Sequence, residues 1–314
     1  KFSDALINFG SALVGALTFA FTDSQWFNAV EAEVYAMSTF FTGIVVWLIL
    51  VWARKEGTKG NVRYIIIIAY MFGIATGIHL LNLLALPLIA LIIYFKKREF
   101  SYLSFLIPVI TTIGIFFVIY LGVIKGFPKI AQNYGIDNII FIVIAVLGVL
   151  AYTIKEKLYF ASTISLSLLL IVIGYSTYAT IFIRAQQSPF INENDPSTLS
   201  KAISYLNREQ YGDWDIEDRT QSLKNSNYAY RWTNNRQDPN SSDVEDFVIN
   251  YQFKEMYLRY FAWQFIGKGE SNWPLFSKKG KYIKSLDGIN AVRYFIPLAF
   301  LLGLFGFYYH FKRD

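Results

Sequence analysis

Long apolar runs without a charged residue constrain the fold of this chain more than any other feature of its sequence. The longest run, residues 64–95, has 32 residues and no Asp, Glu, Lys or Arg. A bilayer core of about 30 Å needs about 20 apolar residues in a helix, whereas this run would reach about 48 Å as a single helix. Its middle contains Gly77, His79 and Asn82. We therefore predict a break at residues 77–82, between two shorter helices.

The remaining apolar stretches extend the same pattern along the chain. Overall, 54% of residues are hydrophobic and 17% are charged, against about 25% charged in average soluble proteins. This composition excludes a disordered chain and a free-standing cytosolic enzyme, and the absence of cysteine excludes a disulfide scaffold and a thiol nucleophile. We predict an all-α polytopic membrane protein with about eight membrane helices. Besides the divided run, the stretches lie near residues 5–21, 36–53, 100–124, 138–154, 158–183 and 291–309.

The placement of basic residues predicts the orientation of these helices. Lys and Arg in short loops remain on the cytoplasmic side of a membrane. Of the 15 basic residues outside residues 184–290, twelve fall on one side of the expected topology. We therefore expect the loop at residues 22–35, the turn at His79 and residues 184–290 on the extracytoplasmic face. The three basic residues on that same face are Lys125, Lys129 and Arg293.

Three regions follow from this topology. Residues 1–183 are expected to form a membrane domain of about seven helices, residues 184–290 an extracytoplasmic, mostly helical domain, and residues 291–314 a final membrane helix and cytoplasmic end. The middle region has 14 basic and 14 acidic residues with Trp and Tyr throughout, which is typical of a folded domain. Within it, residues 251–265 carry aromatic side chains at helical spacing and predict a helix in the membrane interface.

The segment between the first two apolar stretches is acidic. Asp23, Glu31 and Glu33 lie within eleven residues of one another. Ionisable groups at membrane depth are costly, so they usually line a cavity or pair. We interpret them as an acidic rim that activates a hydroxyl or holds a cation; the alternative is a solvated loop with aromatic interface anchors. If the end of the segment is helical, Glu31 and Tyr35 share a face and Glu33 points elsewhere.

His79 is the second candidate, because it lies in an apolar run beside the predicted break. An imidazole there can carry a proton or donate to a phosphate; the alternative is a histidine satisfied by backbone carbonyls. Further along, residues 205–214 mix ions and aromatic rings, which suits sugar stacking or phosphate pairing, although surface salt bridges would give the same pattern. With two histidines and no cysteine, a zinc site is disfavoured, whereas a divalent ion held by carboxylates is compatible with the composition. There is no basic stripe for nucleic acid.

Four segments of the chain stand out together, in this order: residues 21–36 (FTDSQWFNAVEAEVYA), 77–85 (GIHLLNLLA), 191–196 (INENDP) and 206–213 (LNREQYGD). They resemble a multi-spanning bacterial family, long labelled a domain of unknown function. That family is related to the eukaryotic transmembrane protein O-mannosyltransferases and similar to the glycosyltransferase-C superfamily. The resemblance covers most of the chain.

The resemblance implies a glycosyltransferase-C-like fold, a sugar donor linked to a polyprenyl phosphate, and an active site on the extracytoplasmic face. A carboxylate takes the proton of an acceptor hydroxyl while the sugar leaves the lipid phosphate. It also implies a role for each matching position. Glu31, Glu33 and Asp23 are expected in catalysis, His79, Asn82 and Tyr35 beside the donor, and Asn192, Glu193 and Arg208 on the acceptor side.

The expected function is transfer of a mannose-like sugar from this donor to a Ser or Thr hydroxyl of a secreted or membrane protein. The expected location is a bacterial inner membrane, with the large domain facing the periplasm. Members of the family usually carry an upstream Asp-x-Gly-Glu-like motif that this chain lacks, and the chain begins at Lys1 without methionine, so we expect a fragment of a longer polypeptide. Two alternatives stay open: a non-catalytic subunit of an envelope complex, and a lipid or solute transporter.

Overall fold

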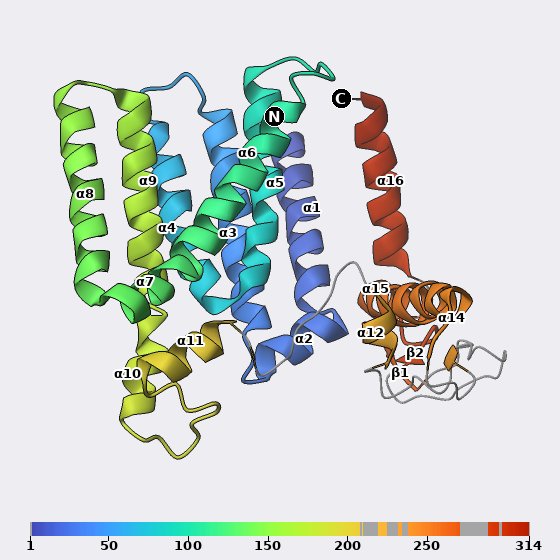
Figure 1. Ribbon diagram of the computed structural model, residues 1–314. Coiled ribbons are helices and arrows are strands. Elements are labelled where there is room, and N and C mark those ends of the chain that lie inside the picture. Colours follow the sequence, from blue (N-terminus) through green and yellow to red (C-terminus); the bar gives the residue numbers. More distant parts are fainter. Residues whose placement is uncertain are drawn as a thin grey trace. The chain divides into compact units, whose positions relative to one another are not determined.

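The computed structural model describes residues 2–207, 209, 219–224, 232–233, 238–270, 288–294 and 297–313. Helices dominate these residues, and the strands within them form a single short antiparallel pair, β1 (Lys268–Gly269) and β2 (Gly288–Ile289) (Figure 1). The predicted class, an all-α polytopic membrane protein, is confirmed. The chain divides into two compact units, residues 34–212 and residues 1–33 together with 213–314. The three predicted regions were drawn by the side of the membrane on which each should lie, not by compactness. They stay a prediction.

Unit 34–212 is a helical bundle (Figure 1). Its core packs apolar side chains from several helices, with Ile49, Phe72 and Ile119 almost completely buried. Its elements are α3 (Tyr35–Arg54), α4 (Val62–Ile78), η1 (Leu80–Leu84), α5 (Ala85–Lys97), α6 (Leu106–Phe117), η2 (Val118–Ile124), α7 (Gly126–Tyr134), α8 (Ile136–Lys155), α9 (Tyr159–Ser176), α10 (Ala179–Gln186) and α11 (Leu199–Asn207).

Fewer helices than expected have the length and hydropathy of a membrane span. Among the described residues there are five, or six if the bent pair α1–α2 counts as one span. Of the predicted eight, α4 has 17 residues and α16 has 16, so both are shorter than the about 20 that a crossing needs. The five spans are Tyr35–Arg54, Leu80–Lys97, Leu106–Tyr134, Ile136–Lys155 and Tyr159–Gln186.

Helix α4 and helix α9 approach each other at two glycines. A Cβ atom on Gly73 would lie 2.4 Å from the carbonyl oxygen of Ile171, and a Cβ atom on Gly174 would lie 2.6 Å from that of Tyr70. Any larger residue would therefore collide with the backbone of the other helix. Small residues allow such close packing between helices in membranes, where packing and hydrogen bonds replace the hydrophobic effect.

The predicted break in the long apolar run is confirmed at its expected place. Helix α4 ends at Ile78, and the chain turns through η1 into α5. Two other irregularities were not expected: η2 is a π-helical stretch, and Thr177–Tyr178 separates α9 from α10. Hydropathy gave no indication of them, because it does not report the hydrogen-bond pattern of the backbone.

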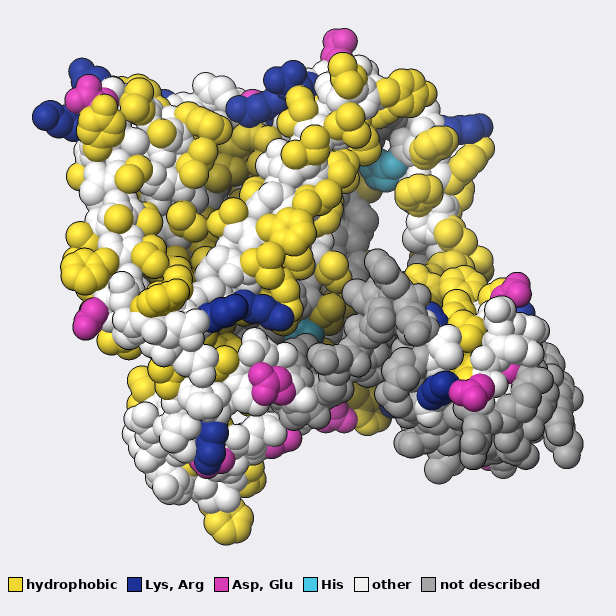
Figure 2. Space-filling view, in the orientation of Figure 1, with side chains coloured by type: hydrophobic (Ala, Val, Ile, Leu, Met, Phe, Trp, Pro, Cys, Tyr) yellow, Lys and Arg dark blue, Asp and Glu magenta, His cyan; other side chains and the backbone are white. Residues whose placement is uncertain are grey.

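The connections that are rich in basic residues lie at one end of this bundle. The α3–α4, α5–α6 and α8–α9 connections lie together at one end, the upper end in Figure 1. Figure 2 shows Lys and Arg side chains gathered there. The α4–η1 turn, α7, α10 and α11 lie at the opposite end. This grouping agrees with the predicted separation of basic loops from the His79 turn; which end faces the cytoplasm stays a prediction.

The second unit combines both ends of the chain. Thr22 caps α2, since its hydroxyl accepts a hydrogen bond from the Gln25 N–H, and α2 is bent by 63° from the preceding helix. The helix predicted at residues 251–265 is confirmed as η4, a π-helical stretch, followed by α15. The elements are α1 (Phe2–Ala20), α2 (Asp23–Val30), α12 (Arg219–Lys224), α14 (Ser241–Asp246), η4 (Phe247–Leu258), α15 (Arg259–Phe265), β1, β2 and α16 (Leu298–Arg313).

Candidate functional site

His79 shapes the turn that follows α4. Its extended backbone (φ −155°, ψ 133°) stops the helix, and its Nδ1 accepts a hydrogen bond of 3.1 Å from the Leu81 N–H at the start of η1. The backbone therefore does satisfy part of this imidazole, through an N–H group rather than the expected carbonyl. Because Nδ1 is an acceptor, the neutral ring carries its proton on Nε2. That tautomer has an N–H group that can donate to an anion.

The buried side chain of Asn82 stabilises the same turn through hydrogen bonds. The side chain is 2% exposed. Its Nδ2 donates to the carbonyl oxygens of Ala75 (2.8 Å) and His79 (2.9 Å), and its Oδ1 accepts from the Thr42 hydroxyl (2.8 Å). This amide thus joins α4, η1 and α3. The geometry favours a role in positioning His79, and a direct contact between Asn82 and the donor stays a prediction.

The ring of Tyr35 lies beside the ring of His79. Tyr35 is the first residue of α3, and its ring centroid lies 5.4 Å from that of His79, with the rings tilted by 49°. Two of the predicted donor-side residues, 44 positions apart in the sequence, are therefore neighbours. Tyr35 is also exposed, so its hydroxyl is available to a ligand at this end of the unit.

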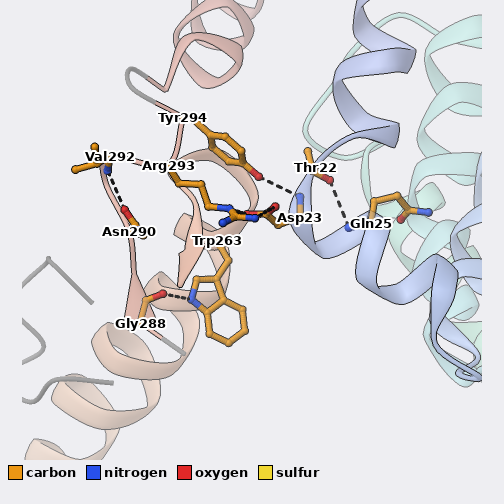
Figure 3. Close-up of polar contacts among 9 residues, drawn as sticks. All are labelled: Thr22, Asp23, Gln25, Trp263, Gly288, Asn290, Val292, Arg293 and Tyr294. Atoms are coloured by element: carbon orange, nitrogen blue, oxygen red, sulfur yellow. Dashed lines mark hydrogen bonds and ion pairs between the residues drawn. The ribbon is translucent and has the colours of Figure 1, made fainter. Parts of the chain in front are cut away.

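Asp23, by contrast, is held by the other end of the chain (Figure 3). Arg293 donates to both of its carboxylate oxygens, from Nε at 2.5 Å and from Nη2 at 2.9 Å, and the Tyr294 hydroxyl accepts from the Asp23 N–H at 3.0 Å. Partial burial raises the pKa of the Asp23 carboxyl, but the Arg293 and Tyr294 hydrogen bonds and the Arg293 charge outweigh it and hold that pKa below its usual range. Such a carboxylate is a weak base. The geometry favours a structural role at the start of α2, and the catalytic role stays a prediction.

Arg293 was not among the predicted site residues. It is 270 positions from Asp23, and no local pattern connects them. One signal was available: Arg293 is one of the three basic residues on the face predicted to be extracytoplasmic, where few are expected. A basic residue on that face that pairs with a carboxylate is charge-balanced, which accounts for one of the three exceptions.

Glu31 and Glu33 lie between two helices. Helix α2 ends at Val30 and α3 begins at Tyr35, and residues 31–34 are not helical. The expectation that Glu31 and Tyr35 share a helical face is therefore wrong, because a non-helical segment separates the two helices. Both carboxylates are exposed, so a substrate can reach them.

The predicted acceptor-side residues fall partly within a tight turn after α10. Asn192 donates from Nδ2 to Asp195 Oδ1 at 2.8 Å, and Asp195 also pairs with Lys201 of α11. The hydrogen bond from Lys201, helped by those from Ser197 and Asn192, holds the pKa of the Asp195 carboxyl below its usual range. Glu193, at the tip, is exposed. Arg208 lies outside the described residues.

A groove of about 410 Å³ adjoins the His79 turn, and the sequence did not predict it. It runs among α7, the start of α8, α10 and α11, and its walls are mainly apolar and aromatic, including Phe127, Phe182 and Leu206. Tyr178 forms part of the wall and packs against Gly77, where an added Cβ atom would lie 3.6 Å from the Tyr178 Cβ. The groove and the turn therefore belong to the same end of unit 34–212.

Within the part of the chain that the structure describes, no group of three or more His, Asp or Glu side chains is arranged to hold a metal ion. The compatibility of the composition with a divalent ion held by carboxylates stays a prediction.

Comparison with known proteins adds one finding. No curated protein and no solved structure matches the chain. A family match covers about a third of it, and that part contains six of the nine candidate residues: Asp23, Glu31, Glu33, Tyr35, His79 and Asn82. Residues 1–102 match the family described as protein O-mannosyl-transferase TMEM260 N-terminal domain, so this part of the chain is similar to the N-terminal domain of a protein O-mannosyltransferase.

Proposed function

We propose that this protein transfers a mannose-like sugar from a polyprenyl phosphate to a Ser or Thr hydroxyl of a secreted or membrane protein, on the extracytoplasmic face of the membrane. One observation carries this proposal. The O-mannosyltransferase match spans residues 1–102, which include all the predicted catalytic and donor-side residues. The multi-pass membrane architecture also suits a donor whose lipid tail remains in hydrocarbon.

The proposed reaction exchanges one bond at the sugar for another. The acceptor oxygen forms a bond to the anomeric carbon, while the bond from that carbon to the phosphate oxygen breaks. The polyprenyl phosphate leaves with the electron pair, and the hydroxyl proton passes to a carboxylate. The anomeric carbon becomes oxocarbenium-like in such transfers, so a nearby carboxylate also stabilises positive charge.

Each candidate residue takes one task in this proposal. Glu31 or Glu33 is the base, because both are exposed, whereas Asp23 is held in an ion pair with Arg293. His79 donates from Nε2 to the departing phosphate, with Tyr35 beside it. Asn192, Glu193 and Arg208 contact the acceptor protein.

Glutamine substitutions test the proposed base. We would express the natural full-length protein in membranes, supply a polyprenyl-phosphate mannose donor, and measure sugar transfer to a Ser/Thr peptide. General-base catalysis typically contributes about 10²- to 10⁴-fold, so Glu31→Gln or Glu33→Gln should lower kcat by at least about 100-fold. Glu156→Gln is the matched control, since Glu156 is an exposed carboxylate beside the α8–α9 connection. Wild-type kcat in both Glu31→Gln and Glu33→Gln would remove these residues from the mechanism.

A further inference from the structure

An exposed row of apolar side chains runs along η4 and α15. Ile249, Phe253, Tyr257 and Phe261 are 42%, 52%, 60% and 43% exposed, and they follow one another at intervals of four residues. Positions four apart lie close to one face in an α-helix such as α15, and also in the slightly wider turn of the π-helical η4. We call these four residues, three of which are aromatic, the aromatic row. The opposite face is buried, as Phe247 packs against Trp232 and Ala262 and Trp263 pack against Ile289.

The aromatic row continues onto α16. The ring of Phe300, near the start of α16, lies 5.8 Å from that of Phe261 and 5.2 Å from that of Phe265. Figure 1 shows η4 and α15 running crosswise to α16, with α15 at the beginning of that helix. The two elements therefore share one apolar surface with a bend in it, and Figure 2 shows hydrophobic side chains where they meet.

Helix α16 indicates what covers this surface. Its apolar side chains are exposed on all sides in the described part of the molecule, including Leu301, Leu302 and Phe305. A helix that is apolar all round needs an apolar environment on every side. A protein partner seated on the aromatic row alone would leave α16 in water, whereas lipid covers both.

The residues that flank the row fit the boundary between lipid and water. Lys254 is exposed beside Phe253, and Arg259 lies over the rings of Tyr260 (5.2 Å) and Trp263 (5.1 Å). Tyr and Trp are enriched at the level of lipid headgroups, and basic side chains there interact with the phosphates.

From this geometry we propose that η4 and α15 form an interfacial helix whose aromatic row is immersed in the lipid surface. The partner of this face is the bilayer itself. The proposal goes beyond the transferase function and does not depend on it, because it rests only on the exposed row and its continuity with α16.

Site-directed spin labelling tests the immersion directly. Residues 1–314 contain no cysteine, so no native cysteine in this part of the protein competes for the label. We would attach a nitroxide at residue 249, 253, 257 or 261 of the full-length protein in phosphatidylcholine–phosphatidylglycerol vesicles. Collision with oxygen, which concentrates in lipid, would be compared with collision with a water-soluble nickel complex. Ser242→Cys and Glu245→Cys, both exposed positions on α14, are the matched controls.

The ratio of oxygen to nickel collisions should be several-fold higher at the four row positions than at the two controls. Equal ratios at row and control positions would overturn the proposal, since the row would then lie in water. Protection from both reagents at the row would also overturn it, because a protein surface would then cover the row. The thermal midpoint of each labelled variant shows that it is folded, and four row positions keep the test valid if one variant is not.

Discussion

Nδ1 of His79 has a structural role, because it accepts a hydrogen bond from the Leu81 N–H and thereby caps the start of η1. The opposite ring nitrogen carries the proton in the neutral ring and is the atom we assign to the donor phosphate. Asn82 supports this arrangement by holding the His79 carbonyl, and it is too deeply buried and too fully hydrogen-bonded to be the best candidate for direct contact with a ligand. One short turn thus contains a group for chemistry and a group that positions it.

Two substitutions at His79 separate these tasks. Asn is a good cap with a side-chain acceptor, so His79→Asn should retain the stability of the turn, whereas His79→Ala should lower the free energy of unfolding by about 1 kcal/mol. Both should raise KM for the lipid-linked donor by about tenfold or more, since a hydrogen bond to a charged group contributes about 1.5–3 kcal/mol. Thermal unfolding in detergent and donor titration measure the two effects. A wild-type KM in His79→Asn would exclude His79 from donor binding.

The Asp23–Arg293 pair predicts a pH dependence. The pKa of Asp23 is lower in the folded protein than in the unfolded chain, so the pair stabilises the fold above the unfolded pKa of about 4, and this stability is lost as pH falls through the folded pKa. Because the Arg293 side chain is half exposed, the contribution is about 1 kcal/mol or less. Asp23→Asn should lower the thermal midpoint by a constant amount between pH 8 and pH 5.

The difference between the wild-type and Asp23→Asn midpoints should shrink as pH falls below about 4 and should vanish below the lowered pKa of folded Asp23, where this carboxyl is protonated. Glu99→Gln, at an exposed carboxylate, is the control and should leave the midpoint unchanged across the range. A difference that stays constant as pH falls from 5 to 2 would show that Asp23 acts through something other than its charge.

At the scale of the elements, most helices follow from local sequence. The apolar run at residues 36–53 and the break at residues 77–82 appear where hydropathy and the Gly-Ile-His turn predict them. Hydropathy did not predict the π-helical geometry of η2 or the interruption at Thr177–Tyr178, because it does not report the hydrogen-bond pattern of the backbone. Nor did it predict that α2 ends at Val30, which leaves Glu31 and Glu33 outside any helix.

The close contact between α4 and α9 predicts that a larger residue at Gly174 destabilises the protein. Gly174→Ala would place a methyl group 2.6 Å from the Tyr70 carbonyl oxygen, so the two helices must separate. Overpacking of this kind costs about 1–3 kcal/mol. The thermal midpoint in detergent should therefore fall, and transfer activity should fall with it, because α4 leads directly to the His79 turn. Gly148→Ala on α8 has open space around the new methyl group and should be neutral or stabilising. Equal midpoints for the two variants would contradict the packing.

At the scale of the whole molecule, the proposal depends on sidedness. We expect single cysteines at residue 58 or 157, in the basic connections of unit 34–212, to face the cytoplasm, and one at residue 193 to face outward. A membrane-impermeant maleimide added to intact cells should label Glu193→Cys and should label Thr58→Cys and Lys157→Cys only after the cells are opened. The reverse pattern would place the His79 turn in the cytoplasm and contradict the proposed donor site.

The sequence alone determined the membrane class, the division of the long apolar run and the grouping of basic connections at one end of the bundle. These properties depend on how each short segment partitions between lipid and water, which composition and charge specify locally. The tertiary structure decided which side chains meet. Thr42 with Asn82, Tyr35 with His79, and Asp23 with Arg293 are 40 to 270 positions apart. Their contacts arise from helix packing and chain topology, which no local periodicity specifies.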